Sequence, residues 1–192
     1  MDELFTRYMY FVRAKMGIKS STTEALRKFY EKDNYALLKK DSTFNDMIIL
    51  AHFWEDVSNQ DRDRFSPRIL HRLFVLNYAP NGMWTYFVSV YFMKNKDANG
   101  MLDDDAFYQF LNRITGFIWT YAVTNPGVNA LRTPVYAEMV NIVNNRPVAF
   151  DGFKFEPATV KRIGTPPKTS TSRATIWKSS SSCRKAISAR SR

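Results

Sequence analysis

Apolar side chains recur every three or four residues along most of the first 145 positions, and short polar or turn-forming stretches separate these repeats. Such spacing places the apolar residues on one face of an α-helix. The repeat over residues 2–16 ends at Gly17, a residue type that often stands just after a helix. The pattern as a whole predicts an all-α fold, an irregular bundle of about seven helices.

Several repeats follow residues that are typical of helix starts. The stretch STTE at 21–24 matches a capping box, in which a hydroxyl and a glutamate bond free amides of the first turn. Proline follows a hydroxyl residue at 66–67 and again at 133–134, and proline suits the first helical turn. We therefore expect helices to begin near residues 22, 67 and 134. A further helix is expected after Ser42 or Thr43, and a break near Asp33 and Asn34.

Two segments depart from the amphipathic pattern. Residues 83–93 are apolar almost all round, and their aromatic and β-branched side chains suit a strand as well as a helix. The helical character of the rest of the chain favours a buried central helix here. Residues 148–155, VAFDGFKF, look like a small β-hairpin with a type I′ turn at Asp151 and Gly152. Two strands alone are marginally stable, so this hairpin would have to pack on the helices.

Charge divides the chain into a body and a tail. The formal net charge is +10, from 28 Lys and Arg residues against 18 Asp and Glu residues. Residues 1–160 hold all of the acidic residues and 19 of the basic ones, so the body is nearly neutral. Residues 161–192 hold no acidic residue, eight Ser and four Thr. We expect a helical bundle domain over 1–156 and a basic Ser/Thr-rich tail over 157–192 that is disordered on its own.

The basic tail suggests an arm that binds the phosphates of DNA, with an affinity that depends on salt and not on sequence. Stacking on bases has weak support, because Trp177 is the one aromatic residue of the tail. The plainer interpretation is an end without a selected role, such as a truncation or a reading out of frame, since the composition changes abruptly. The candidate nucleic-acid-binding residues are Lys161, Arg162, Lys168, Arg173, Lys178, Arg184, Lys185, Arg190 and Arg192.

Residues of the types that carry catalysis are few and scattered. The two histidines, His52 and His71, fall on different expected helices, and the single cysteine, Cys183, has no histidine nearby. The sequence lacks the motifs GxxxxGKS/T, GxGxxG and GxSxG. Glu138 stands among apolar residues, and we expect a structural ion pair with Arg132. The sequence therefore predicts no catalytic residue, no cofactor site and no metal site.

The loop over residues 95–103 resembles a calcium-binding loop. Oxygen-bearing side chains stand at its first, third and fifth positions, and Gly100 stands at the sixth. However, the first ligand would be Asn95, and Ala106 occupies the twelfth position, where a bidentate carboxylate is needed. A polar turn that leads into a helix with acidic residues 103–105 at its start is the favoured interpretation. A calcium-responsive helical module is the weaker alternative.

The N-terminal stretch carries charges at Asp2, Glu3, Arg7 and Arg13, so it lacks the uninterrupted apolar core of a signal peptide. The longest apolar run, residues 83–93, is too short to span a bilayer. A single cysteine is compatible with a reducing compartment. These features predict a cytoplasmic protein that does not enter a membrane.

Three segments carry a family resemblance: LFTRYMY at 4–10, RLFVLNYAPNGMW at 72–84 and NPGVNALRTPVYAEM at 125–139. Together they resemble the helical middle region of large bacterial proteins of the GmrSD type. In that family a ParB-like N-terminal domain carries a DGQQR nucleotide motif, and a C-terminal domain is an HNH-type nuclease. Its members are associated with modification-dependent (type IV) restriction of phage DNA.

Neither the DGQQR motif nor the nuclease histidine motif occurs in this chain, so the resemblance implies neither NTP hydrolysis nor DNA cleavage for any of its residues. It implies a non-catalytic helical connector or scaffold, in a truncated or fragmentary family member. The implied partners are nucleotide-binding and nuclease domains or chains of the same system, and DNA. The alternative is a stand-alone helical DNA-binding protein that uses the cationic tail.

Overall fold

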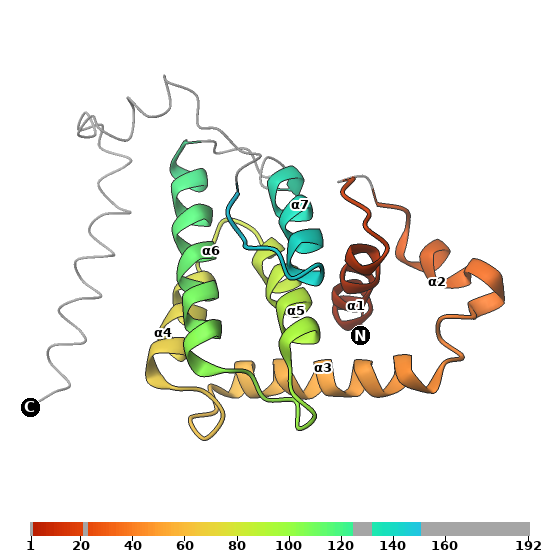
Figure 1. The fold of residues 1–192 in the computed structure, drawn as a ribbon, viewed down its shortest axis with the longest axis horizontal. Helices are drawn as coiled ribbons and strands as arrows, with labels where there is room; N and C mark the ends of the chain where they lie inside the picture. Colours follow the sequence, from red (N-terminus) through yellow and green to blue (C-terminus); the bar gives the residue numbers. More distant parts are fainter. Residues whose placement is uncertain (1, 21–22, 125–131, 151–192) are drawn as a thin grey trace, which may run out of the picture. The chain divides into compact units, whose positions relative to one another are not determined.

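The computed structural model describes residues 2–20, 23–124 and 132–150. They belong to the first of two units into which the chain divides, Met1–Lys154, and the second unit is Phe155–Arg192. Within the described residues the secondary structure consists of seven α-helices, and no β-strand forms there (Figure 1). The predicted all-α fold is therefore confirmed. The helices are α1 (Asp2–Lys15), α2 (Leu26–Tyr35), α3 (Asp41–Asn59), α4 (Pro67–Leu76), α5 (Met83–Asn95), α6 (Asp104–Thr124) and α7 (Arg132–Val143).

Helix α5 is the centre of the bundle. It packs against α1, α3 and α7, while α4 packs against α6, and α1 also contacts α2, α3 and α7. Figure 1 shows α3 running crosswise to α5 and α6. The buried side chains of α5 point in every direction around its axis, as its almost uniformly apolar sequence predicts.

Aromatic rings fill the core around α5. The rings of Phe53, Phe92 and Phe107 are completely buried. Phe53 stacks on Phe92 with 4.1 Å between the ring centroids, and Trp54 donates a hydrogen bond from Nε1 to Ser89 Oγ at 2.9 Å. Burial of this many large rings supplies the main driving force for folding, because each removes a large apolar surface from water.

A second aromatic cluster joins helices that lie far apart in the sequence. The Tyr136 hydroxyl of α7 donates to the Tyr10 hydroxyl of α1 at 2.7 Å, and both side chains are buried. The Tyr10 ring also lies 4.7 Å from the ring of Tyr86 on α5, centroid to centroid. The first, fifth and last helices therefore meet around one polar contact inside an apolar setting.

The observed helix starts agree with the predicted ones in part. Ser66 and Pro67 begin α4 as expected, and the break near Asp33 is present because Asp33 and Asn34 have positive φ angles inside α2. The expected capping box does not begin α2: the helix starts at Leu26, and Glu24 pairs with Lys32 instead. Ser21, the other half of that motif, lies outside the described residues. Two further helices start earlier than expected, α3 at Asp41 and α7 at Arg132.

The first arm of the expected hairpin is not a strand. Residues 148–150 have no strand hydrogen bonding, and their backbone groups bond to side chains of α6 and α7 instead. The expected turn and second arm, residues 151–155, lie outside the described part of the chain. As for membranes, none of the described helices combines the length and the apolar composition that crossing a bilayer requires.

Candidate functional site

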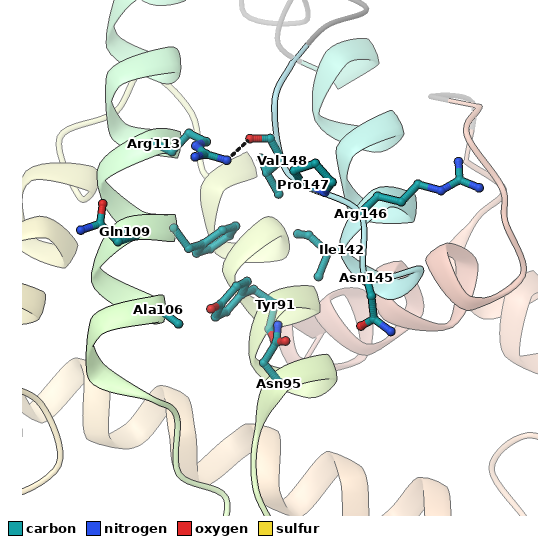
Figure 2. Close-up of a pocket in the computed structure, with 11 residues that line it drawn as sticks. Tyr91, Asn95, Ala106, Gln109, Arg113, Ile142, Asn145, Arg146, Pro147 and Val148 are labelled. Carbon is teal, nitrogen blue, oxygen red and sulfur yellow. Dashed lines mark hydrogen bonds between the residues drawn. The ribbon is translucent and has the colours of Figure 1, made fainter.

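A groove lies between α5, α6 and the turn that follows α7 (Figure 2). Its volume is about 240 Å³. Aromatic rings, amides and guanidinium groups form its walls, and no His, Cys, Asp or Glu is among the described residues that line it. The lining residues are Tyr91, Asn95, Ala106, Gln109, Phe110, Arg113, Ile142, Asn145, Arg146, Pro147 and Val148.

Stacked rings from two helices form the apolar wall of the groove. The Tyr91 ring of α5 stacks on Phe110 of α6 with 4.0 Å between centroids, and it also faces Phe107 at 5.7 Å. Phe107 and Phe110 are three residues apart, so the helical repeat presents both to the same neighbour. Burial, together with the Asp103 carboxylate, raises the pKa of Tyr91 above its ordinary value of 10.0. The Tyr91 phenol therefore stays protonated near neutral pH and cannot serve as a general base there.

One polar side chain of the groove, Arg113, holds the chain that follows α7. Arg113 Nη1 donates to the carbonyl oxygen of Val148 at 2.7 Å (Figure 2). The Arg146 side chain extends away from the groove in the same view.

Residues 147–150, here called the strap, lie between α6 and α7 (Figure 1). Val148 and Phe150 are buried, whereas Ala149 between them is exposed. The Phe150 ring stacks on Phe117 of α6 with 3.7 Å between centroids and an interplanar angle of 6°. It also meets Phe87 of α5 edge-on at 6.1 Å. The strap is therefore part of the core, although it is neither helix nor strand.

Glu138 is buried, with 4% of its surface exposed, and its carboxylate binds the strap. Oε2 accepts the amide of Ala149 at 3.2 Å, and Oε1 accepts the amide of Phe150 at 2.9 Å. Oε2 also accepts from Asn141 Nδ2 at 3.2 Å. The expected partner was Arg132, whose side chain is not among those described. The observed partners are backbone amides. Because every residue except proline has such an amide, the sequence could predict a structural role for Glu138 but not these partners.

The loop before α6 uses its acidic side chains to shape the backbone. Asp97 Oδ1 accepts the amides of Asn99 at 2.8 Å and Met101 at 2.7 Å. Asp103 Oδ1 accepts the amide of Ala106 at 2.8 Å and so caps α6. Among the residues that the structure describes, no three His, Cys, Asp or Glu side chains form a group that could hold a metal ion.

A second hollow of about 380 Å³ lies along α4, and large apolar side chains are exposed beside it. Its lining residues are Gln60, Arg62, Pro67, Leu70, His71 and Phe74. Phe74 is 40% exposed and Tyr78 is 66% exposed, and their rings contact each other edge-on at 5.2 Å. We call Phe74 and Tyr78 the exposed aromatic pair. The other histidine, His52, is exposed on α3.

The predicted DNA-binding residues are Lys161, Arg162, Lys168, Arg173, Lys178, Arg184, Lys185, Arg190 and Arg192. All nine lie outside the described residues, and so does Cys183. Their role therefore stays a prediction.

Comparison of the chain with protein-family models, with curated proteins and with solved structures finds no match. What can be concluded about function therefore comes from the residues themselves. The described part of the chain is an all-α bundle with a groove between α5 and α6 and an exposed aromatic pair beside a hollow along α4.

Proposed function

We propose that this chain is a non-catalytic helical connector or scaffold, related to the middle region of GmrSD-type restriction proteins, that packs against other domains or chains of such a system. The observation that carries the scaffold role is the exposed aromatic pair beside the hollow along α4. Large apolar side chains that stay exposed next to a concavity are typical of interaction surfaces. Aromatic residues are also the side chains that most often dominate binding energy.

The placement of the three segments that resemble the GmrSD type supports the family proposal. Segment 4–10 lies in α1, segment 72–84 joins α4 to α5, and the described end of segment 125–139 lies in α7. Helices α1, α5 and α7 pack on one another, and Tyr10 of the first segment bonds Tyr136 of the third. The resemblance therefore covers residues that build one shared core.

The chemistry of the described residues supports a binding role over a catalytic one. The groove between α5 and α6 offers donors and rings, and its one phenol stays protonated. Purified full-length chain should hydrolyse neither ATP nor GTP and should leave modified DNA intact. Turnover of a nucleotide or cleavage of a phosphodiester by this chain alone would contradict the proposal.

The neighbouring reading frames provide the test of the family. A GmrSD-type system predicts an upstream in-frame DGQQR domain, or an HNH domain in a downstream frame. Intact, unrelated flanking genes would refute the relationship.

The scaffold role predicts that the DGQQR domain or the HNH domain binds the full chain. Titration calorimetry measures the dissociation constant. Phe74→Ser with Tyr78→Ser should weaken binding at least tenfold, because truncated aromatic anchors lose more than 1 kcal/mol of binding free energy each, roughly. Phe44→Ser is the matched control, since Phe44 is 65% exposed on another helix, α3. If the wild type, the double variant and Phe44→Ser bind with equal affinity, the aromatic pair is not the docking surface.

The alternative function, DNA binding through the tail, is favoured by the absence of acidic residues from 161–192. Binding of duplex DNA by the full chain would then fall steeply with salt concentration and disappear when residues 161–192 are deleted. Binding that survives the deletion would assign DNA to the helical body.

A further inference from the structure

The strap is held through consecutive main-chain groups. Arg113 binds the carbonyl of residue 148, and Glu138 binds the amides of residues 149 and 150. We call Arg113 and Glu138 the clamp. Arg113 belongs to α6, and Glu138 belongs to α7. Recognition of main-chain groups does not depend on the side chains of the bound segment, and grooves that bind extended peptides use the same device.

The side chains of the strap alternate between buried and exposed. Val148 and Phe150 point into the bundle, and the intervening Ala149 is exposed. Phe117 and Phe87 form the subsite for the Phe150 ring. A ligand of this site therefore needs an apolar residue, then a residue that faces solvent, then an aromatic residue.

The helices that form the walls around the strap also pack against other helices. Helix α6 packs against α4, and α7 packs against α1 and α5. The walls of the space between α6 and α7, here called the strap slot, therefore have packing partners besides the strap. Phe150 has a φ angle of 55°, a left-handed conformation that is rare for a residue other than glycine. This strain opposes docking of the chain's own segment.

We propose that the strap slot is a binding site for a short peptide with an apolar residue and an aromatic residue two positions apart, and that residues 147–150 occupy it in cis. The site goes beyond the scaffold role and does not depend on it. Three residues separate the end of α7 at Val143 from the strap, and such a short tether gives an effective concentration on the order of millimolar. A peptide from another chain must therefore reach about millimolar concentration to displace the strap. A lower concentration would suffice for a variant in which the strap binds its slot more weakly.

The first experiment uses the wild-type full chain labelled with ¹⁵N. Unlabelled acetylated and amidated peptide of residues 146–150, RPVAF, is added to several millimolar while the amides of Ala149 and Phe150 are followed by NMR. Displacement should shift both resonances and speed their hydrogen exchange, and the peptide RPVAA should have no such effect. Unchanged resonances and exchange rates at these two positions would overturn the proposal.

The second experiment empties the aromatic subsite. Full-length Phe150→Ala should bind fluorescent RPVAF at least tenfold more tightly than the wild type, whereas Phe44→Ala should bind like the wild type. Adding Arg113→Met to Phe150→Ala should weaken that binding at least fivefold, because the carbonyl clamp is lost. Circular dichroism establishes that each variant is folded. If Phe150→Ala is folded and binds RPVAF no more tightly than the wild type does, the proposed site is refuted. If Phe150→Ala is unfolded, the NMR displacement experiment on the wild-type chain tests the proposal instead.

Discussion

At the scale of single residues, buried polar side chains of this bundle bond mainly to backbone groups. Tyr30 is buried, and its hydroxyl donates to the carbonyl oxygen of Phe5 at 2.7 Å. Glu138 likewise accepts two backbone amides. A buried polar group without a partner costs free energy, so each of these contacts supports the packing around it.

Tyr30 predicts a loss of stability at alkaline pH. Burial raises its pKa well above the ordinary value of 10.0, and burial also raises the pKa of Tyr8 and Tyr91. The folded chain therefore keeps protons that the unfolded chain releases above about pH 10. The free energy of unfolding should be unaffected by these groups below that pH and should fall as the pH rises beyond it.

Urea denaturation at pH 8 and pH 11 measures this effect. Tyr30→Phe should lose about 1 kcal/mol at pH 8, from the missing hydrogen bond, and should show a smaller further loss at pH 11 than the wild type does. Tyr78→Phe, a change on the surface, should follow the wild-type curve. An identical pH dependence in all three chains would contradict the role of Tyr30.

Glu138 predicts a large effect of a single substitution. Glu138→Ala removes the acceptor of the buried Phe150 amide and of the partly buried Ala149 amide, and a buried group without a partner costs about 1–3 kcal/mol. We expect the free energy of unfolding to drop by about 2–5 kcal/mol. The exposed Glu55→Ala should change it by less than about 0.5 kcal/mol. Equal effects of the two substitutions would show that the strap does not depend on Glu138.

At the scale of elements, periodicity predicted where helices lie better than it predicted where they start. Among the described residues, the apolar repeat located six of the seven helices, and the uniformly apolar α5 was expected to be a central helix. Helix starts depend on which side chain reaches a free amide, and several residue types compete for that role. Glu24 shows this competition, because it pairs with Lys32 and leaves the start of α2 to Ala25.

The start of α6 gives a prediction about capping. Asp103→Ala removes the hydrogen bond to the amide of Ala106 and should lower the free energy of unfolding by about 0.5–2 kcal/mol. Asp41→Ala is the matched control, because Asp41 lies in the first turn of α3, where no side-chain cap is formed. It should cost no more than about 0.5 kcal/mol, through the helix dipole alone. Thermal or urea unfolding followed by circular dichroism compares the two variants.

The loop before α6 gives a prediction about calcium. Asp97 Oδ1 already accepts two amides of its own loop, and the position of the bidentate ligand is Ala106. Millimolar calcium should therefore leave the melting temperature of the chain unchanged, with magnesium as the control. A rise specific to calcium would mean that the ion stabilises the folded state by binding to it.

At the scale of the whole molecule, the sequence predicted the fold class but not the site. Residues 148–150 were expected to be a hairpin arm because Asp151 and Gly152, which follow them, are typical of a type I′ turn. The binding of the strap by Arg113 and Glu138 joins residues from α6 and α7 to main-chain groups, and such contacts leave no local pattern. The groove beside it could not be predicted for the same reason, since its walls come from separate helices.

The contact between α1 and α7 predicts measurable coupling across the sequence. A double-mutant cycle on Tyr10→Phe and Tyr136→Phe should give an interaction energy of about 0.5–1.5 kcal/mol, because each hydroxyl bonds the other inside the core. A cycle on Tyr10→Phe and Tyr78→Phe should give an interaction energy near zero, because Tyr78 is exposed on the surface. Additive effects at Tyr10 and Tyr136 would contradict the buried hydroxyl pair.

The same contact constrains the order in which the chain can fold during translation. Helix α1 is synthesised before its packing partners α5 and α7, which follow some 70 and 120 residues later. Until α7 emerges, the apolar face of α1 has only part of its final surroundings, and contacts between residues far apart in sequence form slowly. Between the synthesis of α1 and that of α7, the nascent polypeptide therefore exposes part of the apolar face of α1, and a chaperone that binds apolar surface would act in this interval.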